Sequence, residues 1–256
     1  MSGILDAFKL DGKVAIVTGS ERGLGRGMAV ALAQAGADIV GVTYAAEAPE
    51  TAAAIAAAGR KYVHIQANLL SIEPIDGIVA KALEAFGHID ILVNNAGIIT
   101  RNDSVNFTEK EWDDVMNINL KTAFFMCQTV ARQFIAQGTG GKIVNIASML
   151  SFQGGIRVPS YTASKSGIKG ITMLMANEWA KHGITVNAIA PGYMATDNTT
   201  QLRADEKRNA EILDRIPAGR WGTPEDLGGA VVFLASKASD YVNGYTVAVD
   251  GGWLAR

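Results

Sequence analysis

The chain has 256 residues, 48% of them apolar, and its 23 Lys and Arg nearly balance its 25 Asp and Glu. This length allows a large buried core, and the near-neutral charge without long charged runs argues against a nucleic-acid partner. No apolar run is long enough to cross a bilayer, the start MSGILDAFKLDGK has no signal-peptide pattern, and the single Cys127 cannot form an intrachain disulfide, so we expect a cytoplasmic protein without a membrane partner.

Short apolar runs alternate along the chain with longer helix-like stretches. Strands are predicted at residues 13–19, 37–43, 62–68, 89–97, 142–148, 184–192 and 245–252, and long helices at 24–36, 75–87 and 111–137. Because these strands lack polar alternation, we expect both faces of their sheet to be covered. Several helices should end at the glycines Gly36, Gly59, Gly87 and Gly183. The pattern predicts an α/β fold: one doubly wound, Rossmann-type domain over residues 1–256, with a parallel sheet of about seven strands and helices on both faces.

The segment from Gly192 to Gly222 is longer and more charged than the other connections. It is predicted to form one or two short helices after a strand, either as a lid over a site or as a solvated excursion. Glu211 and Arg215 have the i,i+4 spacing of a self-paired helix surface.

A glycine loop follows the first predicted strand and opens a helix. It contains Gly19, Arg22, Gly23, Leu24 and Gly25. Glycines let the backbone approach a pyrophosphate, and the helix start offers free N–H groups and a positive dipole end. The loop therefore predicts a dinucleotide cofactor.

The choice between NAD and NADP depends on charges near the adenosine ribose. The second strand ends with Thr43 and Tyr44, which carry no charge, whereas an acidic residue there would bond the ribose hydroxyls. Arg22 could pair with a 2′-phosphate, and Glu21 would oppose one. We expect NAD, with NADP possible.

Tyr161 and Lys165 lie four residues apart on a helix predicted to begin near Pro159, and therefore share one face. A tyrosine is a poor base at neutral pH, so we expect the Lys165 ammonium and an oxidised nicotinamide to lower the pKa of its phenol. The tyrosine would then exchange a proton with a substrate alcohol or ketone. Ser148 ends a predicted strand at the edge of the sheet where ligands bind, and could bond the same substrate oxygen.

These motifs resemble the short-chain dehydrogenase/reductase family along essentially the whole chain. The resemblance implies that Asn119, Ser148, Tyr161 and Lys165 are catalytic, with Asn119 holding a water that connects Lys165 to solvent. It also implies further cofactor contacts: Asn68, where the family commonly has Asp, Leu69, Asn95, Ala96, Gly97, Pro191, Gly192, Met194 and Thr196. Asn94 of the same Asn-Asn-Ala-Gly motif would steady the sheet.

Within the family, the segments FGHIDILVNNAG and NIASMLSFQGGIRVPSYTASKSG resemble enzymes that act on keto sugar acids from polyuronide breakdown. Such a substrate needs a cation for its carboxylate. Arg157, between Ser148 and Tyr161, is the candidate, with Arg203 as the second choice and a surface ion pair of Arg157 as the alternative. Gln153 could bond sugar hydroxyls.

Two other functions remain open: reduction of a 3-ketoacyl group on a carrier protein, and non-catalytic sensing of a dinucleotide. The resemblance also implies a homotetramer packed through helices 112–137 and 159–182. The three histidines, His64, His88 and His182, show no metal-ligand spacing, so no metal is expected.

Overall fold

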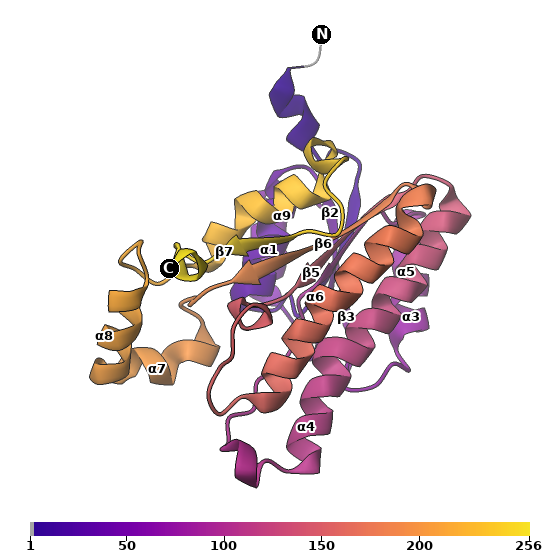
Figure 1. Ribbon diagram of the computed structural model, residues 1–256. Helices are drawn as coiled ribbons and strands as arrows, with labels where there is room; N and C mark the ends of the chain where they lie inside the picture. The colour runs from indigo at the N-terminus through magenta and orange to yellow at the C-terminus, as the bar shows by residue number, and fades with distance from the viewer. Residues whose placement is uncertain (1–2) are drawn as a thin grey trace.

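The computed structural model describes residues 3–256; Met1 and Ser2, at the start of the predicted domain, lie outside the described residues. Seven parallel strands form a sheet in the order β3-β2-β1-β4-β5-β6-β7 (Figure 1). Their bounds are Val14–Thr18 (β1), Asp38–Thr43 (β2), Tyr62–Gln66 (β3), Ile91–Asn94 (β4), Gly141–Ile146 (β5), Ile184–Pro191 (β6) and Thr246–Val249 (β7). Each strand falls on one of the seven predicted segments, within two residues at its start, and the predicted parallel fold is confirmed.

Helices cover both faces of the sheet (Figure 1). One face packs against α1 (Gly23–Gln34), α2 (Pro49–Ala57) and α9 (Gly228–Ala235), and the other against α3 (Ile75–Phe86), α5 (Ala123–Gln137) and α6 (Pro159–Trp179). Side chains such as Ile16, Leu92 and Val144 are fully buried between these layers. Burial on both faces explains why the strands read as continuous apolar runs. No helix of residues 3–256 is long and apolar enough to span a membrane.

The glycines predicted to end helices adopt the required backbone. Gly36, Gly59, Gly87 and Gly183 all have positive φ. Gly87 follows α3 with φ of 80°, where its N–H bonds the carbonyl of Leu83. A residue with a Cβ would be strained in this conformation, so glycine ends the helix at little cost.

The long helix predicted over residues 111–137 is interrupted. It consists of α4 (Glu109–Met116) and α5, joined by a π-helical turn over Asn117–Thr122. Turns of this kind occur mostly as short insertions, frequently at functional sites. The turn holds Asn119 against the loop that follows β4, where its side chain bonds the main chain of Ile98.

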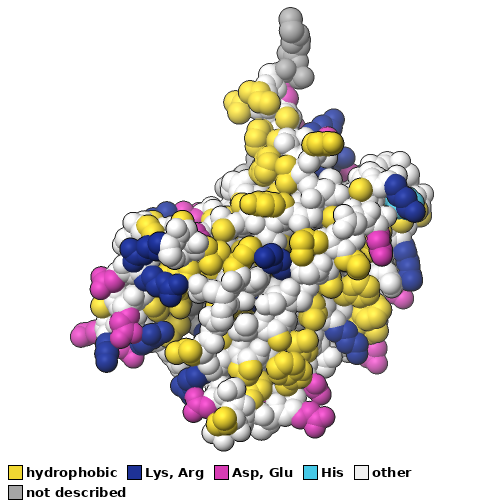
Figure 2. All heavy atoms as spheres, in the orientation of Figure 1, with side chains coloured by type: hydrophobic (Ala, Val, Ile, Leu, Met, Phe, Trp, Pro, Cys, Tyr) yellow, Lys and Arg dark blue, Asp and Glu magenta, His cyan; other side chains and the backbone are white. Residues whose placement is uncertain are grey.

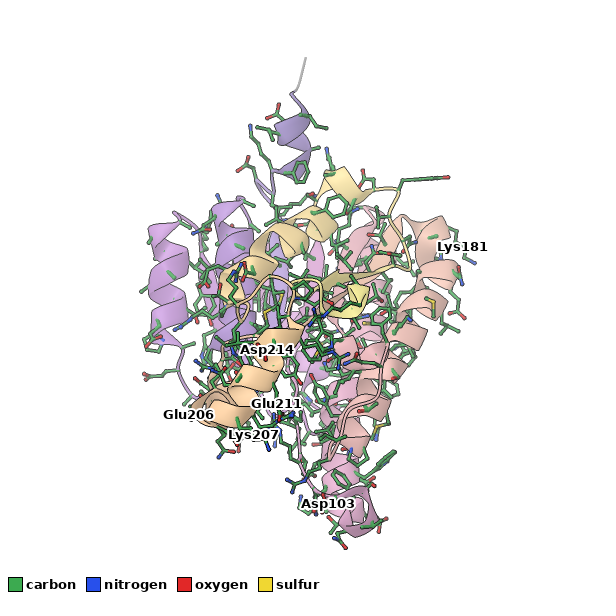
Figure 3. All side chains as sticks on the ribbon, turned by 60° about the vertical axis from the view of Figure 1, so that its left-hand side comes forward. Asp103, Lys181, Glu206, Lys207, Glu211 and Asp214 are labelled. Carbon is green, nitrogen blue, oxygen red and sulfur yellow. The ribbon has the colours of Figure 1, made fainter. Side chains whose placement is uncertain are left out.

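The segment between Gly192 and Gly222 forms two short helices, α7 (Thr200–Ala204) and α8 (Glu206–Arg215), as predicted. Its base is closed where Ala195 N donates to the Gly222 carbonyl at 2.7 Å. The labelled charges Glu206 and Asp214 lie on α8 in Figure 3, and Figure 1 shows α7 and α8 to one side of the sheet. The ion pair suggested between Glu211 and Arg215 is not formed: Glu211 pairs with Arg208 at 2.8 Å, because Arg215 lies over the Trp253 ring at 4.0 Å.

Candidate active site

The candidate site lies at the carboxyl ends of β1 and β4, where the strand order reverses, which is the usual ligand position in such sheets. The loops after these two strands are bonded together. Thr18 Oγ1 accepts from the main-chain N–H groups of Asn95 and Ala96 at 3.0 and 2.9 Å. Asn95 Nδ2 donates in return to the carbonyls of Thr18 and Gly19 at 2.9 and 3.1 Å. The Asn-Asn-Ala-Gly segment thus fixes the shape of the glycine loop.

The glycine loop forms a tight cradle at the start of α1. A Cβ on Gly25 would collide with the carbonyl oxygen of Gly19, and Gly19 itself has φ of 67°. Within residues 3–256, Ser20 Oγ and Glu21 Oε2 are buried polar atoms without a hydrogen-bond partner. Buried groups of this kind normally have a partner. The loop therefore has the backbone and the spare polar atoms that a dinucleotide requires.

The residues expected at the adenosine end are engaged within the protein. Thr43 is buried, and its Oγ1 contacts His64 Nε2 at 2.6 Å and the carbonyl of Ala45 at 2.7 Å. Asn68 Oδ1 accepts from Leu70 N at 3.1 Å, and Leu69 is buried in the core. The Thr43 hydroxyl is therefore committed to its neighbours, which sequence alone does not reveal.

A groove of about 490 Å³ runs along the outer side of the glycine loop. It is lined by Glu21, Arg22, Gly23, Arg26, Glu47, Ala48, Pro49, Glu50, Ala195, Thr196, Asp197 and Pro224. Arg22 Nη1 pairs with Asp197 Oδ2 at 3.2 Å, and Arg26 pairs with Glu50. Four carboxylates thus face two guanidiniums in this groove, whereas the predicted catalytic residues do not line it.

The loop after β6 closes the other side of the predicted cofactor site. Gly192 follows Pro191, and a Cβ there would lie 2.7 Å from the Cα of Asp250. Met194 is buried, and Thr196 lies opposite Gly23 across the groove. Close packing at Gly192 places this loop against the end of β7.

Ser148 follows β5 at the same edge of the sheet. It is buried, its Oγ accepts from Leu150 N at 3.2 Å, and its own N–H donates to Ser151 Oγ at 3.3 Å. Ser151 Oγ donates onward to the carbonyl of Lys165 at 2.6 Å. Ser151, which the sequence reading did not single out, thus connects the Ser148 loop to α6.

Tyr161 and Lys165 lie on the first two turns of α6, which begins at Pro159 as predicted. Lys165 is buried, and its Nζ lies 5.7 Å from the centre of the Tyr161 ring and donates to the Ile146 carbonyl at 2.6 Å. Burial lowers the pKa of Lys165 to about 8. Its proton therefore titrates much closer to neutral pH than that of an exposed lysine.

The pKa of Tyr161 differs from the sequence-based expectation. Burial raises it, while a hydrogen bond with Ser148 and the charge of Arg101 act in the lowering direction. The expected lowering by Lys165 does not occur in the protein alone, because desolvation outweighs the favourable contacts and Lys165 is held at Ile146. The phenol is therefore protonated at neutral pH unless further positive charge lies beside it.

Asn119 is buried in the π-helical turn and binds the loop after β4. Its Oδ1 accepts from Ile98 N at 2.8 Å, and its Nδ2 donates to Ile98 O at 2.9 Å and Ser164 Oγ at 3.3 Å. A Cβ on Gly97 would lie 2.9 Å from Asn119 Oδ1, so glycine is needed for this approach. The side chain of Asn119 thus joins the loop after β4 to α6.

The residues predicted to bind substrate have partners within the protein. Arg157 has φ of 62° and pairs with Asp103 at 2.9 Å, and its carbonyl accepts from Asn102 N at 2.9 Å. This is the ion-pair alternative considered from the sequence; Asp103 lies at the lower end of the molecule in Figure 3. Gln153 Oε1 accepts from Arg215 of α8 at 3.3 Å. Arg203 Nη2 bonds the carbonyl of Thr196 at 3.2 Å.

Sequence reasoning missed Arg101. It follows β4 by seven residues, its charge acts on the Tyr161 phenol, and its Nη2 donates to the Asn198 carbonyl at 3.3 Å. Its position after Asn-Asn-Ala-Gly was the available signal, because that loop begins at the ligand-binding edge of the sheet. Arg101 thus reaches both the phenol and the segment at 192–222.

Comparison with known proteins gives a consistent assignment. A family model described as enoyl-(acyl carrier protein) reductase matches residues 18–254. The chain is 68% identical over 253 residues to 2-dehydro-3-deoxy-D-gluconate 5-dehydrogenase of Escherichia coli (strain K12), covering 99% of this chain and 100% of that protein. The enzyme of the same name from Bacillus subtilis (strain 168) is 53% identical, with 98% of each chain covered. A crystal structure assigned as 2-deoxy-D-gluconate 3-dehydrogenase from Agrobacterium tumefaciens, with bound NADP, is 54% identical, has a TM-score of 0.90, and matches over 98% of this chain and 100% of its own.

Proposed function

The chain belongs to the short-chain dehydrogenase/reductase family, and from this membership we propose that it transfers a hydride between a nicotinamide dinucleotide and a deoxy keto sugar acid. The substrate class is that of 2-dehydro-3-deoxy-D-gluconate or 2-deoxy-D-gluconate, and the reacting group is a secondary alcohol or ketone. The observation that carries the proposal is full-length identity of 68% to such an enzyme. The contacts of the Tyr161 side chain with Ser148 and Lys165 support it independently.

The cofactor is proposed to bind along the glycine loop. Gly19, Gly23 and Gly25 leave room for a pyrophosphate, and Ser20 Oγ and Glu21 Oε2 offer unpaired polar atoms for hydroxyl groups. NAD is the proposed cofactor, because the groove beside the loop has more carboxylates than guanidiniums; NADP, present in the Agrobacterium tumefaciens relative, is the alternative. When bound, the nicotinamide supplies or accepts the hydride.

Tyr161 is proposed to give a proton to the substrate carbonyl during reduction and to take it back during oxidation. Its raised pKa keeps the phenol protonated, as reduction requires. Ser148, which lowers the pKa of that phenol through a hydrogen bond, would hold the same substrate oxygen. Lys165, with a pKa of about 8, is suited to passing protons onward near neutral pH. Asn119, in the π-helical turn, is proposed to hold the water through which Lys165 exchanges protons with solvent.

Arg101 is proposed to bind the substrate carboxylate. It is the guanidinium whose charge reaches Tyr161, whereas Arg157 faces Asp103. Arg157 then acts by holding the loop that carries Arg101, and Gln153 remains the candidate for a sugar hydroxyl. The segment at residues 192–222 is the proposed lid, because Arg101 and Gln153 both bond it.

A carrier-bound 3-ketoacyl substrate is less well supported. Docking an acidic carrier favours a basic face, yet on the face in Figure 2 the Lys and Arg side chains are interspersed with Asp and Glu. A dinucleotide sensor without chemistry would not need a buried lysine beside a tyrosine. We therefore retain the sugar-acid enzyme.

We further propose a cytoplasmic homotetramer that acts in pectin or polyuronide degradation. The chain has a single cysteine, Cys127, which cannot form an intrachain disulfide, and this cysteine usage suits a reducing compartment. Ile135 on α5 and Met173 and Leu174 on α6 are between 43% and 48% exposed, which is unusual for apolar side chains on long helices. These are the helices expected to pack across subunits.

The test is turnover by the purified full chain with NADH and NADPH against a panel of 5-keto and 3-keto sugar acids and a 3-ketoacyl thioester. We expect oxidation of NADH with a deoxy keto sugar acid at least about a hundredfold faster than with the thioester. Preferential turnover of the thioester would replace the proposal with the carrier-protein alternative. Cofactor binding without turnover of any substrate would favour the sensor.

A further inference from the structure

The groove beside the glycine loop contains an ion pair between distant parts of the chain. Arg22, in the loop after β1, pairs at 3.2 Å with Asp197, the first residue of the turn that leads into α7. Both side chains are well exposed to solvent, at 68% and 72%. An exposed pair of this kind is weak, so a ligand that offers Arg22 a stronger anion can displace Asp197.

The position of the groove indicates which anion would do so. It extends from Asp197, past Arg22 and Gly23, to Glu47 and Glu50 at the start of α2, just beyond the end of β2. The adenosine ribose of a dinucleotide lies at the end of the second strand in folds of this type. A phosphate on the ribose 2′-hydroxyl would therefore enter this groove, and a hydroxyl group would not need a cation there.

The charges of the groove oppose that phosphate. Its guanidiniums are Arg22 and Arg26, and each is paired with a carboxylate, Asp197 or Glu50. Glu21 and Glu47 add two further carboxylates. Repulsion between like charges and the loss of an existing ion pair both weaken binding of a 2′-phosphate.

We propose that Asp197 is a determinant of cofactor selectivity, which disfavours NADP by occupying Arg22. This inference rests on the proposed dinucleotide function and assigns selectivity to a residue of the lid rather than to the end of β2. The residue acts through Arg22, and neutralising it leaves the guanidinium available for the 2′-phosphate.

The test measures equilibrium binding by calorimetry, using NAD⁺ and NADP⁺ with the full chain and no substrate. Asp197→Asn should tighten NADP⁺ binding about threefold to tenfold and change NAD⁺ binding less than about twofold. Glu84→Gln on α3 removes one carboxylate far from the groove and should leave both affinities unchanged. Arg22→Ala should weaken NADP⁺ binding more than NAD⁺ binding.

The double variant Arg22→Ala/Asp197→Asn decides whether the effect passes through Arg22. It should lack the tighter NADP⁺ binding that is expected for Asp197→Asn alone. A gain that survives in the double variant, or equal changes for both cofactors, would overturn the inference. A gain from Glu50→Gln but none from Asp197→Asn would assign the role to Arg26 and equally overturn it.

The outcomes separate this inference from the proposed function. Wild-type protein that binds neither dinucleotide would remove the proposed function itself. Normal NAD⁺ binding with an unchanged selectivity ratio would remove only the role of Asp197. If Asp197→Asn disturbed the lid enough to abolish NAD⁺ binding, equal effects of Arg22→Ala on the two cofactors would still refute the inference.

Discussion

Lys165 Nζ donates a 2.6 Å hydrogen bond to the carbonyl oxygen of Ile146, the last residue of β5. The lysine is 5% exposed, and burial lowers its pKa from 10.5 to about 8. The structure thus holds a titratable ammonium at the edge of the sheet, with a main-chain acceptor rather than a carboxylate as its partner.

This arrangement predicts a pH-dependent stability. Between pH 8 and 10.5 the unfolded chain still binds the lysine proton while the folded chain has released it, so the free energy of unfolding should rise with pH through this window. A shift of this size corresponds to about 3 kcal/mol at most. Urea unfolding of wild type and Lys165→Met at pH 7 and pH 10 measures it. The variant should lack the rise. If the free energy of unfolding changed with pH equally in both proteins, burial would not lower the pKa of Lys165 in the folded chain.

Ser151 is predicted to position Ser148 and Lys165, the proposed catalytic serine and lysine. Its hydroxyl accepts from Ser148 N and donates to Lys165 O, so Ser151→Ala would remove the acceptor of Ser148 N and the side-chain bond that joins the Ser148 loop to α6. We expect kcat to fall about tenfold with little change in the KM for the cofactor. The matched control is Ser166→Ala, whose hydroxyl makes only a 3.5 Å contact on the exposed side of α6. Equal kinetics in the two variants would contradict a positioning role.

Gly25 and Gly77 form a matched pair of helical glycines. A Cβ at Gly25 would collide with Gly19 O, whereas a Cβ at Gly77 in α3 would have no neighbour within 4 Å. Gly25→Ala should abolish dinucleotide binding and destabilise the fold, and Gly77→Ala should stabilise it by about 0.5–1 kcal/mol. Thermal unfolding with and without NAD⁺ distinguishes the two. Cofactor binding by Gly25→Ala similar to wild type would mean that the cradle is not used.

The two candidate arginines are separated by their kinetic effects. Arg101→Ala should raise KM for the sugar acid about a hundredfold, because the proposed contact of its guanidinium with the substrate carboxylate beside Tyr161 would be lost. Arg157→Ala should have a smaller effect, about threefold to tenfold, because it loosens the loop with Asn102 and Asp103 to which Arg157 is bonded. Steady-state kinetics with acid and amide forms of the substrate test this. A larger loss in Arg157→Ala that is specific to the acid would restore Arg157 as the carboxylate partner.

Most of the fold could be predicted because its signals are local. Strands buried on both faces read as apolar runs, helix ends need glycine at positions such as Gly87, and Pro159 starts α6. Tyr161 and Lys165 share one face of α6, as their spacing predicts, and this face lies beside the loop after β5 that carries Ser148. That these residues and Asn119 are catalytic stays a prediction.

What could not be predicted depends on long-range geometry. The π-helical turn around Asn119 has no distinctive residue pattern, and the pKa of Tyr161 depends on burial, which tertiary packing decides. The Thr43 hydroxyl contacts His64 of the neighbouring strand, and the charge of Arg101 acts on Tyr161 only because the fold brings together two residues 60 positions apart.

The proton-transfer role of Tyr161 is tested most directly by comparing wild type with Tyr161→Phe in reduction of a 5-keto sugar acid by NADH. Removal of one hydroxyl should lower kcat by at least about a thousandfold, while calorimetry shows unchanged NADH binding and the melting temperature stays within a few degrees of wild type. Turnover close to the wild-type rate in this folded, cofactor-binding variant would contradict Tyr161 as the proton donor.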